Sequence, residues 1–338
     1  IIKPSIIAAI KTTFELIFIT SKLKKEKIFY IYKFLHIQFS SMEDKWSIDN
    51  IDSQSGKIIV ITGSNSGVGL ETAKILVDKG ATVVLACRNK LLGEQTQKEL
   101  GINSHFIQVD TGIKESMDMF SETLSKKFEK IDLLINNAGV MFNPPSTTKD
   151  DLEITFGVNY IGYFYLTLKL ISMIKNISSS RIISVSSIAS YHINKLDWGY
   201  FNPKRTFSSF SDKQKIYDHT NLFRLMFALK LDSILRERKS KITSVPCHPG
   251  VAKSKLGRHV PLVKFFYHTP FLIPASKGCY PILKASTDIV KGGDFIGFDG
   301  KGQWKGNPIV VEPNTLAKDP YLQEKLWNKS LEITGINF

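Results

Sequence analysis

The segment TGSNSGVG places three glycines where a nucleotide phosphate could bind. Gly63, Gly67 and Gly69 fall between an apolar run that ends at Thr62 and a stretch with apolar residues at helical spacing. At such a junction, main-chain N–H groups and the positive end of the helix can hold a pyrophosphate. The spacing is Gly-x-x-x-Gly-x-Gly, which differs from the general dinucleotide fingerprint, and a tight turn alone would also require glycines. The segment therefore indicates phosphate binding only together with other motifs.

Short apolar runs alternate with helical patterns around this segment. The runs are KIIVIT from residue 57, ATVVLAC from 81, SHFIQVD from 104 and IDLLIN from 131. Each run is typical of a buried strand. The stretches between them have helical character, and one of them places Ile113, Met117, Phe120, Leu124 and Phe128 three or four residues apart. Because parallel neighbours need a crossover connection, the alternation predicts a parallel sheet covered on both faces.

The rest of the chain continues the same pattern. We expect a helix near 159–175, a strand at RIISVSS, a helix from about Tyr217 to Arg236 and a strand at KITSVPC. Polar, aromatic and proline-containing stretches interrupt the alternation at 187–217 and at about 254–272, as loops over a pocket would. No linker or internal repeat is visible. The sequence therefore predicts an α/β fold in a single domain, a doubly wound Rossmann-type parallel sheet with helices on both faces.

The charge and composition restrict the class of protein. Of 338 residues, 43% are apolar and 22% are charged, which is typical of an ordinary globular protein. The net charge is +14, which raises the question of nucleic acid or an anionic membrane as a partner. However, residues 1–41 alone carry +5, and the rest of the chain has no arginine-rich stripe or zinc-finger spacing. This pattern favours a lysine-rich surface with a pocket for cofactor phosphate and no nucleic-acid partner.

Cysteines and the N-terminal segment bear on the location of the protein. Cys87, Cys247 and Cys279 are far apart, so we expect neither a disulfide framework nor a metal site, and a reducing, cytoplasmic or cytosol-facing environment is favoured. Residues 1–41 are rich in Ile and Phe, but Lys11 and Glu15 interrupt the run that a transmembrane helix needs. Three interpretations of this leader remain: an interfacial or signal anchor that makes peripheral membrane contact, a targeting peptide, or an extension outside the working protein. The globular domain is expected at 42–338.

A series of short motifs occurs in a fixed order along residues 46–338. The motifs are WSIDNIDSQSGKIIVITGSNSGVGLETA, ACRN, VD, NNAG, GVNYIGYF, RIISVSS, CHPGV and LWNKSLEITGI. In these motifs the chain resembles the short-chain dehydrogenase/reductase family, in particular its retinol-dehydrogenase-like members. The resemblance implies a nicotinamide cofactor and hydride transfer between that cofactor and a carbonyl or alcohol carbon.

The resemblance also implies which residues bind the cofactor. They are Gly63, Ser64, Ser66, Gly67, Val68 and Gly69 at the phosphates, Asp110 near the adenine edge, Asn137, Ala138 and Gly139 on the ribose side, and Pro249, Gly250 and Ser254 beside the nicotinamide amide. Arg88 in ACRN follows the second strand, where a cation can pair with the extra phosphate of NADP. An enzyme that uses NAD would prefer an acid there, so we expect NADP, although a surface arginine is the simpler alternative.

Three residues match the family's catalytic positions. They are Asn159 in GVNYIGYF, Ser187 as the second serine of SVSS, and Tyr217 at the start of the helix YDHTNLFRLMFALKL. The resemblance implies that Tyr217 moves the proton, that Ser187 polarises the substrate oxygen, and that Asn159 completes a proton route through water. A tyrosine is a poor base at neutral pH unless positive charge lowers its pKa from about 10, and the family supplies that charge with a lysine four residues further on.

The expected lysine position is Asn221 in this chain. Related sequences read Tyr-x-x-Ser-Lys, whereas this one reads Tyr-Asp-His-Thr-Asn. An amide cannot lower the pKa of a tyrosine as a cation does, so catalytic competence is open. Arg224 shares a helix face with Tyr217 and Asn221, so its guanidinium either reaches the site or faces solvent. Other literal Tyr-x-x-x-Lys patterns fit the family order poorly, and these are Tyr191/Lys195, Tyr280/Lys284 and Tyr321/Lys325.

Aromatic residues fill the long gap between Ser187 and Tyr217. We expect them to wall an apolar pocket, together with residues of the second loop, although packing of the loop alone would explain any one of them. The set is Tyr191, Trp198, Tyr200, Phe201, Phe207 and Phe210, with Leu262, Phe265, Phe266 and Tyr267 opposite. The expected substrate is a small lipophilic carbonyl or alcohol.

Two functions from different classes remain after these observations. The first is an NADP-dependent oxidoreductase of retinol-dehydrogenase-like type. The alternative is a non-catalytic NADP-binding protein in which Asn221 has removed turnover. A nucleic-acid or membrane adaptor on the same fold is disfavoured, and a homo-oligomer is compatible with either function.

Overall fold

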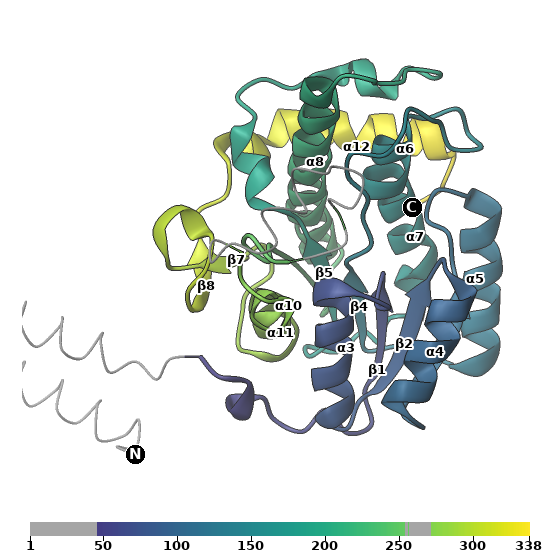
Figure 1. Cartoon of the computed structure of the whole chain (residues 1–338), viewed down its shortest axis with the longest axis vertical. Helices are drawn as coiled ribbons and strands as arrows, with labels where there is room; N and C mark the ends of the chain where they lie inside the picture. Colours follow the sequence, from purple (N-terminus) through teal and green to yellow (C-terminus); the bar gives the residue numbers. More distant parts are fainter. Residues whose placement is uncertain (1–45, 254–255, 257–271) are drawn as a thin grey trace, which may run out of the picture. The chain divides into compact units, whose positions relative to one another are not determined.

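The apolar runs of the sequence form one mixed sheet at the centre of the molecule (Figure 1). The computed structural model describes residues 46–253, 256 and 272–338. Within them, the strand order is β3-β2-β1-β4-β5-β6-β7-β8, and only β8 is antiparallel to its neighbour. The strands are β1 (Ile58–Thr62), β2 (Thr82–Cys87), β3 (Ser104–Gln108), β4 (Leu133–Asn136), β5 (Arg181–Val185), β6 (Thr243–Cys247), β7 (Phe295–Phe298) and β8 (Pro308–Val311).

Helices cover both faces of this sheet. They are α3 (Gly67–Asp78), α4 (Lys90–Leu100), α5 (Lys114–Lys127), α6 (Ile154–Phe156), α7 (Gly162–Leu170), α8 (Phe210–Glu237), α10 (Ala275–Gly278), α11 (Tyr280–Thr287) and α12 (Pro320–Thr334). Right-handed crossovers place α3 and α4 on one face, and the reversal of direction after β3 places α5, α7 and α8 on the other. The α10–α11 pair packs against α3, and α12 packs on α8. The predicted doubly wound α/β fold is confirmed.

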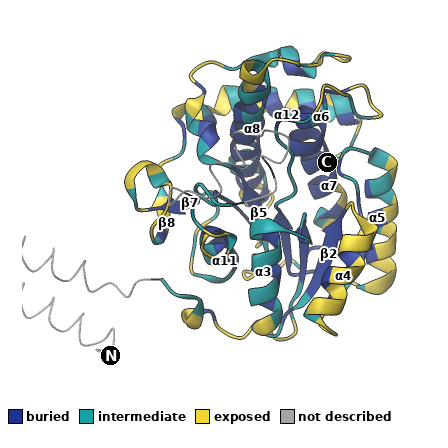
Figure 2. Ribbon diagram, viewed as in Figure 1, coloured by how far each residue is buried: buried dark blue, intermediate teal, exposed yellow. Residues whose placement is uncertain are grey.

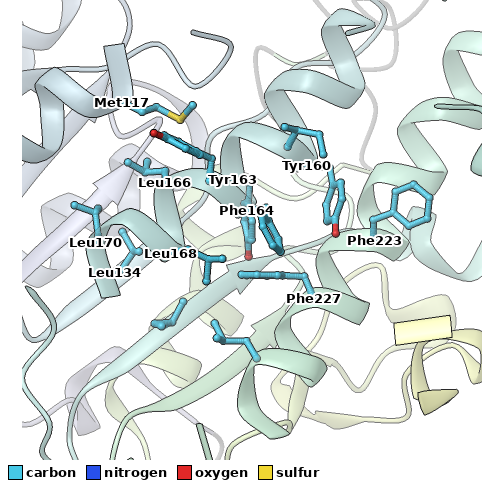
Figure 3. Packing of buried hydrophobic residues seen from close by; sticks show 14 of the residues in the cluster. Met117, Leu134, Tyr160, Tyr163, Phe164, Leu166, Leu168, Leu170, Phe223 and Phe227 are labelled. Atoms are coloured by element: carbon cyan, nitrogen blue, oxygen red, sulfur yellow. The ribbon is translucent and has the colours of Figure 1, made fainter. Parts of the chain in front are cut away.

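Aromatic side chains join α7, α8 and α12 into a rigid layer. The Phe227 ring lies 5.3 Å from Phe164 in an edge-on contact and 5.8 Å from Trp327 in a stacked contact, measured between ring centroids. Figure 3 shows the neighbouring side chains of this cluster, among them Tyr160, Tyr163, Phe164, Phe223 and Phe227. Figure 2 shows that the strands and the inner sides of α7 and α8 are buried, whereas α4 exposes its outer side. This packing fixes α8, which carries Tyr217, and α7, which directly follows the turn that carries Asn159.

The helix that carries Tyr217 begins earlier than the sequence predicts. We expected Tyr217 to open it, but α8 starts at Phe210, with Ser209 as the N-cap that accepts from the Asp212 N–H. The prediction was wrong because the first two turns are polar and half-exposed, so they lack the apolar spacing of the rest. As a result, Tyr217 lies within a helix and its main chain is fixed by the turns on either side.

Two other parts of the chain differ from the expectations or extend them. The strands β7 and β8 and the helices α10 to α12 were not predicted, because their short apolar runs contain glycine or follow proline. No helix among the described residues is long and apolar enough to cross a membrane. The leader 1–41, Ser254 and the loop residues Leu262, Phe265, Phe266 and Tyr267 lie outside the described residues.

Candidate active site

The glycine segment forms a tight turn between β1 and α3. This turn has no room for a side chain at Gly63 or Gly69. Gly63 has φ +67°, and a Cβ atom there would lie 2.9 Å from the Ala138 Cα. A Cβ on Gly69 would lie 2.3 Å from the Asn137 Nδ2 and 2.6 Å from the Gly63 carbonyl oxygen. The Asn137 Nδ2 donates to the carbonyls of Thr62, at 2.8 Å, and Gly63, at 3.2 Å. The turn is therefore locked to the end of β4.

Polar groups of this turn fit a phosphate ligand. Ser64 is fully buried, and its hydroxyl has no hydrogen-bond partner among the described residues. Ser66 is the N-cap of α3, and its side chain makes no capping bond in the described part of the chain. Helix α3 has twelve residues, so its N-terminus presents a substantial positive dipole end. The orphaned hydroxyl and the close-packed glycines together suit the pyrophosphate of a dinucleotide.

Arg88 and Asp110 face each other at the carboxyl ends of neighbouring strands. Arg88 follows β2 and Asp110 follows β3, and the Arg88 Nη1 lies 3.8 Å from the Asp110 Oδ2. The Asp110 Oδ1 accepts from the Gly112 N–H at 2.9 Å, which fixes the carboxylate. The Arg88 side chain is 58% exposed. Its guanidinium is thus available to an anionic group at this edge.

The segment after β6 approaches the N-terminal end of α3. A Cβ on Gly278 in α10 would lie 3.0 Å from the Val68 Cγ1 and 3.4 Å from the Pro249 carbonyl oxygen. Gly250 has φ +63°, and a Cβ there would lie 2.3 Å from the Trp304 carbonyl oxygen. The structure therefore brings Pro249 and Gly250 close to the glycine turn. Residue Ser254 of the same predicted set lies outside the described residues.

Asn159 connects the end of β4 to the helix layer. It lies in η2, a π-helical turn (Gly157–Ile161) between α6 and α7, and such turns are frequent at functional sites. Its Oδ1 accepts from the Val140 N–H at 2.8 Å, and its Nδ2 donates to the Val140 carbonyl at 2.9 Å. Gly139 lies next to it, because a Cβ on Gly139 would be 3.4 Å from the Asn159 Oδ1. The Asn159 side chain thus fixes the main chain at Val140, in the loop that follows β4.

Ser187 and Tyr217 lie close enough for the serine to act on the tyrosine hydroxyl. Ser187 lies two residues after the end of β5 at Val185 and caps a short helical turn, with its Oγ accepting from the Ala189 N–H at 3.2 Å. Tyr217 approaches from α8, and Ser187 is among the groups that lower the pKa of its hydroxyl. A hydroxyl pair at the carboxyl end of a parallel strand can polarise a substrate oxygen and transfer a proton to it.

Several groups act on the Tyr217 hydroxyl in opposite directions. Burial raises the pKa of Tyr217, and this is the largest effect. The positive charge of Arg224 lowers the pKa of Tyr217, as do hydrogen bonds from Ser187 and Asn221, while the Asp218 carboxylate raises it. The net result is a pKa of Tyr217 above its usual value of about 10. The hydroxyl is therefore protonated at neutral pH and suited to donate a proton.

Asn221 is a buried helical residue that carries no charge to the site. Its Nδ2 donates to the Tyr217 carbonyl at 2.9 Å, and its own carbonyl accepts from the Ser186 hydroxyl at 2.8 Å. It is almost completely buried. The residue at the expected lysine position therefore stabilises α8 and ties it to β5.

Comparison with known proteins agrees with this arrangement. The family model described as short chain dehydrogenase matches residues 57–213. Retinol dehydrogenase 12 of Homo sapiens is 33% identical over 294 residues, which cover 84% of this chain and 88% of that protein. The chain belongs to the short-chain dehydrogenase family. Its sequence relatives place it in the retinol-dehydrogenase-like branch.

Solved structures show the same short-chain dehydrogenase fold. An uncharacterized protein from Mycobacterium Paratuberculosis has a TM-score of 0.72 at 27% identity, over 87% of this chain and 99% of that one. A 3-ketoacyl-(acyl-carrier-protein) reductase from Brucella melitensis, complexed with NADH, has a TM-score of 0.55 at 24% identity, over 71% of this chain and 96% of that one. The chain thus belongs to a family of oxidoreductases.

The other Tyr-x-x-x-Lys patterns of this short-chain dehydrogenase are engaged elsewhere. The Tyr191 hydroxyl donates to the Glu312 carbonyl at 2.6 Å. Lys284 pairs with Asp288, and the Tyr321 side chain is 71% exposed. Tyr217, which has Asn221 in place of the lysine, acts together with Ser187 instead.

Most of the aromatic residues expected to wall a substrate pocket pack elsewhere. Trp198 stacks on Phe223, and Phe201 makes an edge-on contact with Phe156. Tyr200 and Phe207 contact each other edge to face, and the Arg205 guanidinium lies near both rings. The loop 193–209 folds onto α6 and α8 and packs against the core, which favours the alternative that these four residues serve the packing of the loop. Tyr191 likewise packs against Phe295.

Phe210 is the member of the predicted set that contacts the segment following Gly139. Its ring stacks on Phe142, with centroids 4.5 Å apart and planes at 13°. Phe142 has φ +54°, a strained conformation for a bulky residue. The stack links the segment that follows Gly139 to the first turn of α8. Phe142 was missed, since nothing in the sequence distinguishes it from other loop residues.

Thr62 is a second residue that the sequence analysis missed. Its Oγ1 accepts from the N–H groups of Asn137 and Ala138, both at 2.9 Å. It thereby joins the glycine turn to the end of β4, as the Asn137 side chain does from the other direction. A hydroxyl residue directly before the first glycine was the available signal.

Proposed function

We propose that this protein is an NADP-dependent oxidoreductase that acts on a lipophilic carbonyl or alcohol, as its retinol-dehydrogenase-like relatives' names suggest. The observation that carries the proposal is the proximity of Ser187 and Tyr217 beyond the carboxyl end of β5, where Ser187 acts on the ionisation of the Tyr217 hydroxyl. On the same edge of the sheet, the glycine turn presents the cradle that a dinucleotide pyrophosphate requires.

Each of the site residues has its own role in the proposed reaction. The nicotinamide cofactor supplies or accepts the hydride when it is bound. Ser187 donates a hydrogen bond to the substrate oxygen, and Tyr217 gives that oxygen a proton during reduction or removes it during oxidation. Asn159 and Asn137 hold the segment 137–140, along which the ribose side of the cofactor is expected. Val68, Pro249 and Gly250 close the opposite side of the cradle.

The lipophilic substrate class rests on the relatives and on one aromatic contact. Retinol dehydrogenase 12 is named for an apolar alcohol. The Phe142–Phe210 stack provides an apolar surface between the segment after Gly139 and the start of α8. We propose that this stack, rather than the loop 193–209, contacts the apolar part of the substrate.

Arg88 is expected to select NADP over NAD. Its half-exposed guanidinium stands beside Asp110 at the adenine end, and a charge-assisted bond to phosphate contributes about 1.5–3 kcal/mol. Arg88→Ala should therefore weaken NADPH binding by about 10–100-fold and leave NADH binding within about threefold of native. Fluorescence titration with each cofactor measures both affinities. An equal loss for both cofactors would contradict the proposed role, and Lys90→Ala, on a neighbouring exposed cation, provides the control.

A second candidate function follows from Asn221. Because this residue is uncharged, the site lacks a cation at the usual position. The chain would then bind NADP without turning over substrate. NADPH fluorescence responds to binding under either function, whereas consumption of NADPH requires catalysis.

The deciding experiment measures NADPH consumption with a panel of lipophilic aldehydes and ketones. The native protein and the Asn221→Lys variant are compared in the same assay. Turnover by the native protein is the expected result. Turnover by Asn221→Lys alone would contradict it and favour the cofactor-binding function. Binding of NADPH without turnover by either protein would exclude the proposed substrate class.

A further inference from the structure

Arg224 is a buried cation at the base of the candidate active site. Its side chain is held by main-chain carbonyls of three separate segments. The Nε donates to the carbonyl of Asn159 in η2, the Nη1 to Val185 at the end of β5 at 3.0 Å, and the Nη2 to Ala138 after β4 at 2.6 Å. The residue is only 4% exposed. These bonds place the guanidinium where the segments that carry the site residues converge.

The charge of Arg224 is not balanced by a carboxylate in the described part of the chain. The bonds described for it end on carbonyls, and the ionisable groups that act on it are the hydroxyls of Tyr163 and Tyr217. The Tyr163 ring also lies 5.2 Å from the guanidinium. A buried charge costs several kcal/mol unless it is paired. The buried positive charge of Arg224 therefore stabilises the ionised form of a nearby tyrosine hydroxyl.

Arg224 and Tyr217 lie on the same face of α8. Arg224 comes seven residues, or about two turns, after Tyr217, and helical side chains point back toward the N-terminus, which is the direction of Tyr217. The Tyr217 carbonyl accepts from the Thr220 hydroxyl at 2.8 Å, and that hydroxyl is 3.5 Å from the Asn159 Nδ2. A Cβ on Gly139 would lie 3.3 Å from the Arg224 Nη2. The guanidinium therefore lies beside the expected ribose side, and its positive charge acts on the Tyr217 hydroxyl.

We infer that Arg224 is a positioning residue of this site, whose guanidinium supplies to the Tyr217 hydroxyl the positive charge that the uncharged Asn221 cannot. The inference rests on the proposed function, because it assigns the charge to the same proton-transfer site. Arg224 does not touch the substrate. It acts through Tyr217, and it also joins η2, β4 and β5 at their ends.

The groups around Tyr217 are consistent with this role. Arg224 is the strongest of the groups that lower the pKa of Tyr217, and the Ser187 and Asn221 hydrogen bonds follow it. Asp218 acts in the opposite direction, and its carboxylate lies 3.3 Å from the His192 Nδ1. Loss of the Arg224 charge would therefore raise the pKa of Tyr217 further, since burial and Asp218 would then be opposed by hydrogen bonds alone.

The test replaces Tyr217 by 3,5-difluorotyrosine, whose phenol ionises near neutral pH and has almost the size of tyrosine. In the full chain, near-ultraviolet absorbance then reports the ionisation of this one position. Arg224→Met, which removes the charge, should move the titration upward by about one pH unit or more. In the chain with natural Tyr217, it should also lower NADPH-dependent turnover at neutral pH by about tenfold or more. Adding Asn221→Lys to Arg224→Met should return the titration toward native.

Two further variants keep the inference falsifiable. Arg224→Gln retains hydrogen-bond donors, so it provides the same titration if Arg224→Met does not fold. Arg236→Met removes an exposed cation of the same helix and should leave the titration unchanged. An unchanged titration in a folded Arg224→Met or Arg224→Gln protein would overturn the inference. If the titration shifts but the native protein shows no turnover, the inference stands and the proposed function fails.

Discussion

Replacing Tyr217 with phenylalanine is expected to lower NADPH-dependent turnover by about 10²–10⁴-fold, the range that a positioned acid or base contributes. The substitution removes the hydroxyl on which Ser187 and Arg224 act and keeps the ring. Cofactor binding should persist, because the glycine turn and the segment 137–140 are held by their own hydrogen bonds. Steady-state assays with a lipophilic aldehyde, together with NADPH fluorescence titration, measure the two effects separately.

Tyr321→Phe is the matched control for this prediction. Tyr321 is also followed four residues later by a lysine, but its side chain is 71% exposed. We expect native turnover from this variant. If Tyr217→Phe retained turnover within about threefold of native, Tyr217 would not be the proton donor and the assignment of the site would fail.

The pH dependence of the reverse reaction gives a second readout of Tyr217. Alcohol oxidation needs the ionised hydroxyl, and burial holds the pKa of Tyr217 above its usual value. The ionised fraction is therefore small at neutral pH and increases as the pH rises. The rate of oxidation should increase by about tenfold per pH unit in this range. In Tyr217→Phe the remaining rate should not follow this slope.

The central sheet could be predicted from the sequence because its strands are buried on both faces. A buried parallel strand has to be a continuous apolar run, and runs such as those at β1 and β2 stand out against their polar flanks. The strands β7 and β8 lack this signal. Phe295–Phe298 contains glycine, and Pro308–Val311 is an exposed edge strand that begins with proline. The order of strands at that edge depends on tertiary packing.

The candidate site was predictable where its residues occupy a motif at the end of a strand. Asn137 follows β4 directly and Ser187 lies two residues after β5, so the sheet itself brings them to one edge. The position of Arg224 could not be predicted, because helical spacing allows a side chain on that face to reach the site or to face solvent. Its burial depends on three carbonyls that are distant in the sequence. Likewise, only the folded loop shows that Trp198 and Phe201 pack on the core.

The second large effect is expected from Gly69→Ala, which should weaken NADPH binding by about 10–100-fold. The new Cβ would lie 2.3 Å from the Asn137 Nδ2 and 2.6 Å from the Gly63 carbonyl oxygen. Asn137 would then have to release the carbonyls of Thr62 and Gly63, and the turn would shift away from β4. Loss of one main-chain bond to a charged phosphate corresponds to about 1.5–3 kcal/mol, which is about 10–100-fold in affinity. Fluorescence titration with NADPH measures the loss.

Gly101→Ala separates this effect from a general loss of stability. Gly101 ends α4 with φ +79°, and no atom lies within 4 Å of a Cβ there. Alanine at Gly101 is therefore strained by about 1–3 kcal/mol but collides with nothing, so thermal stability should decrease while NADPH affinity stays native. If Gly69→Ala lost stability alone and bound NADPH with native affinity, the turn between β1 and α3 would not be the phosphate cradle. Because the cofactor positions, the roles of Asn137 and Thr62 and the selectivity of Arg88 all depend on that cradle, this pair of variants tests them together.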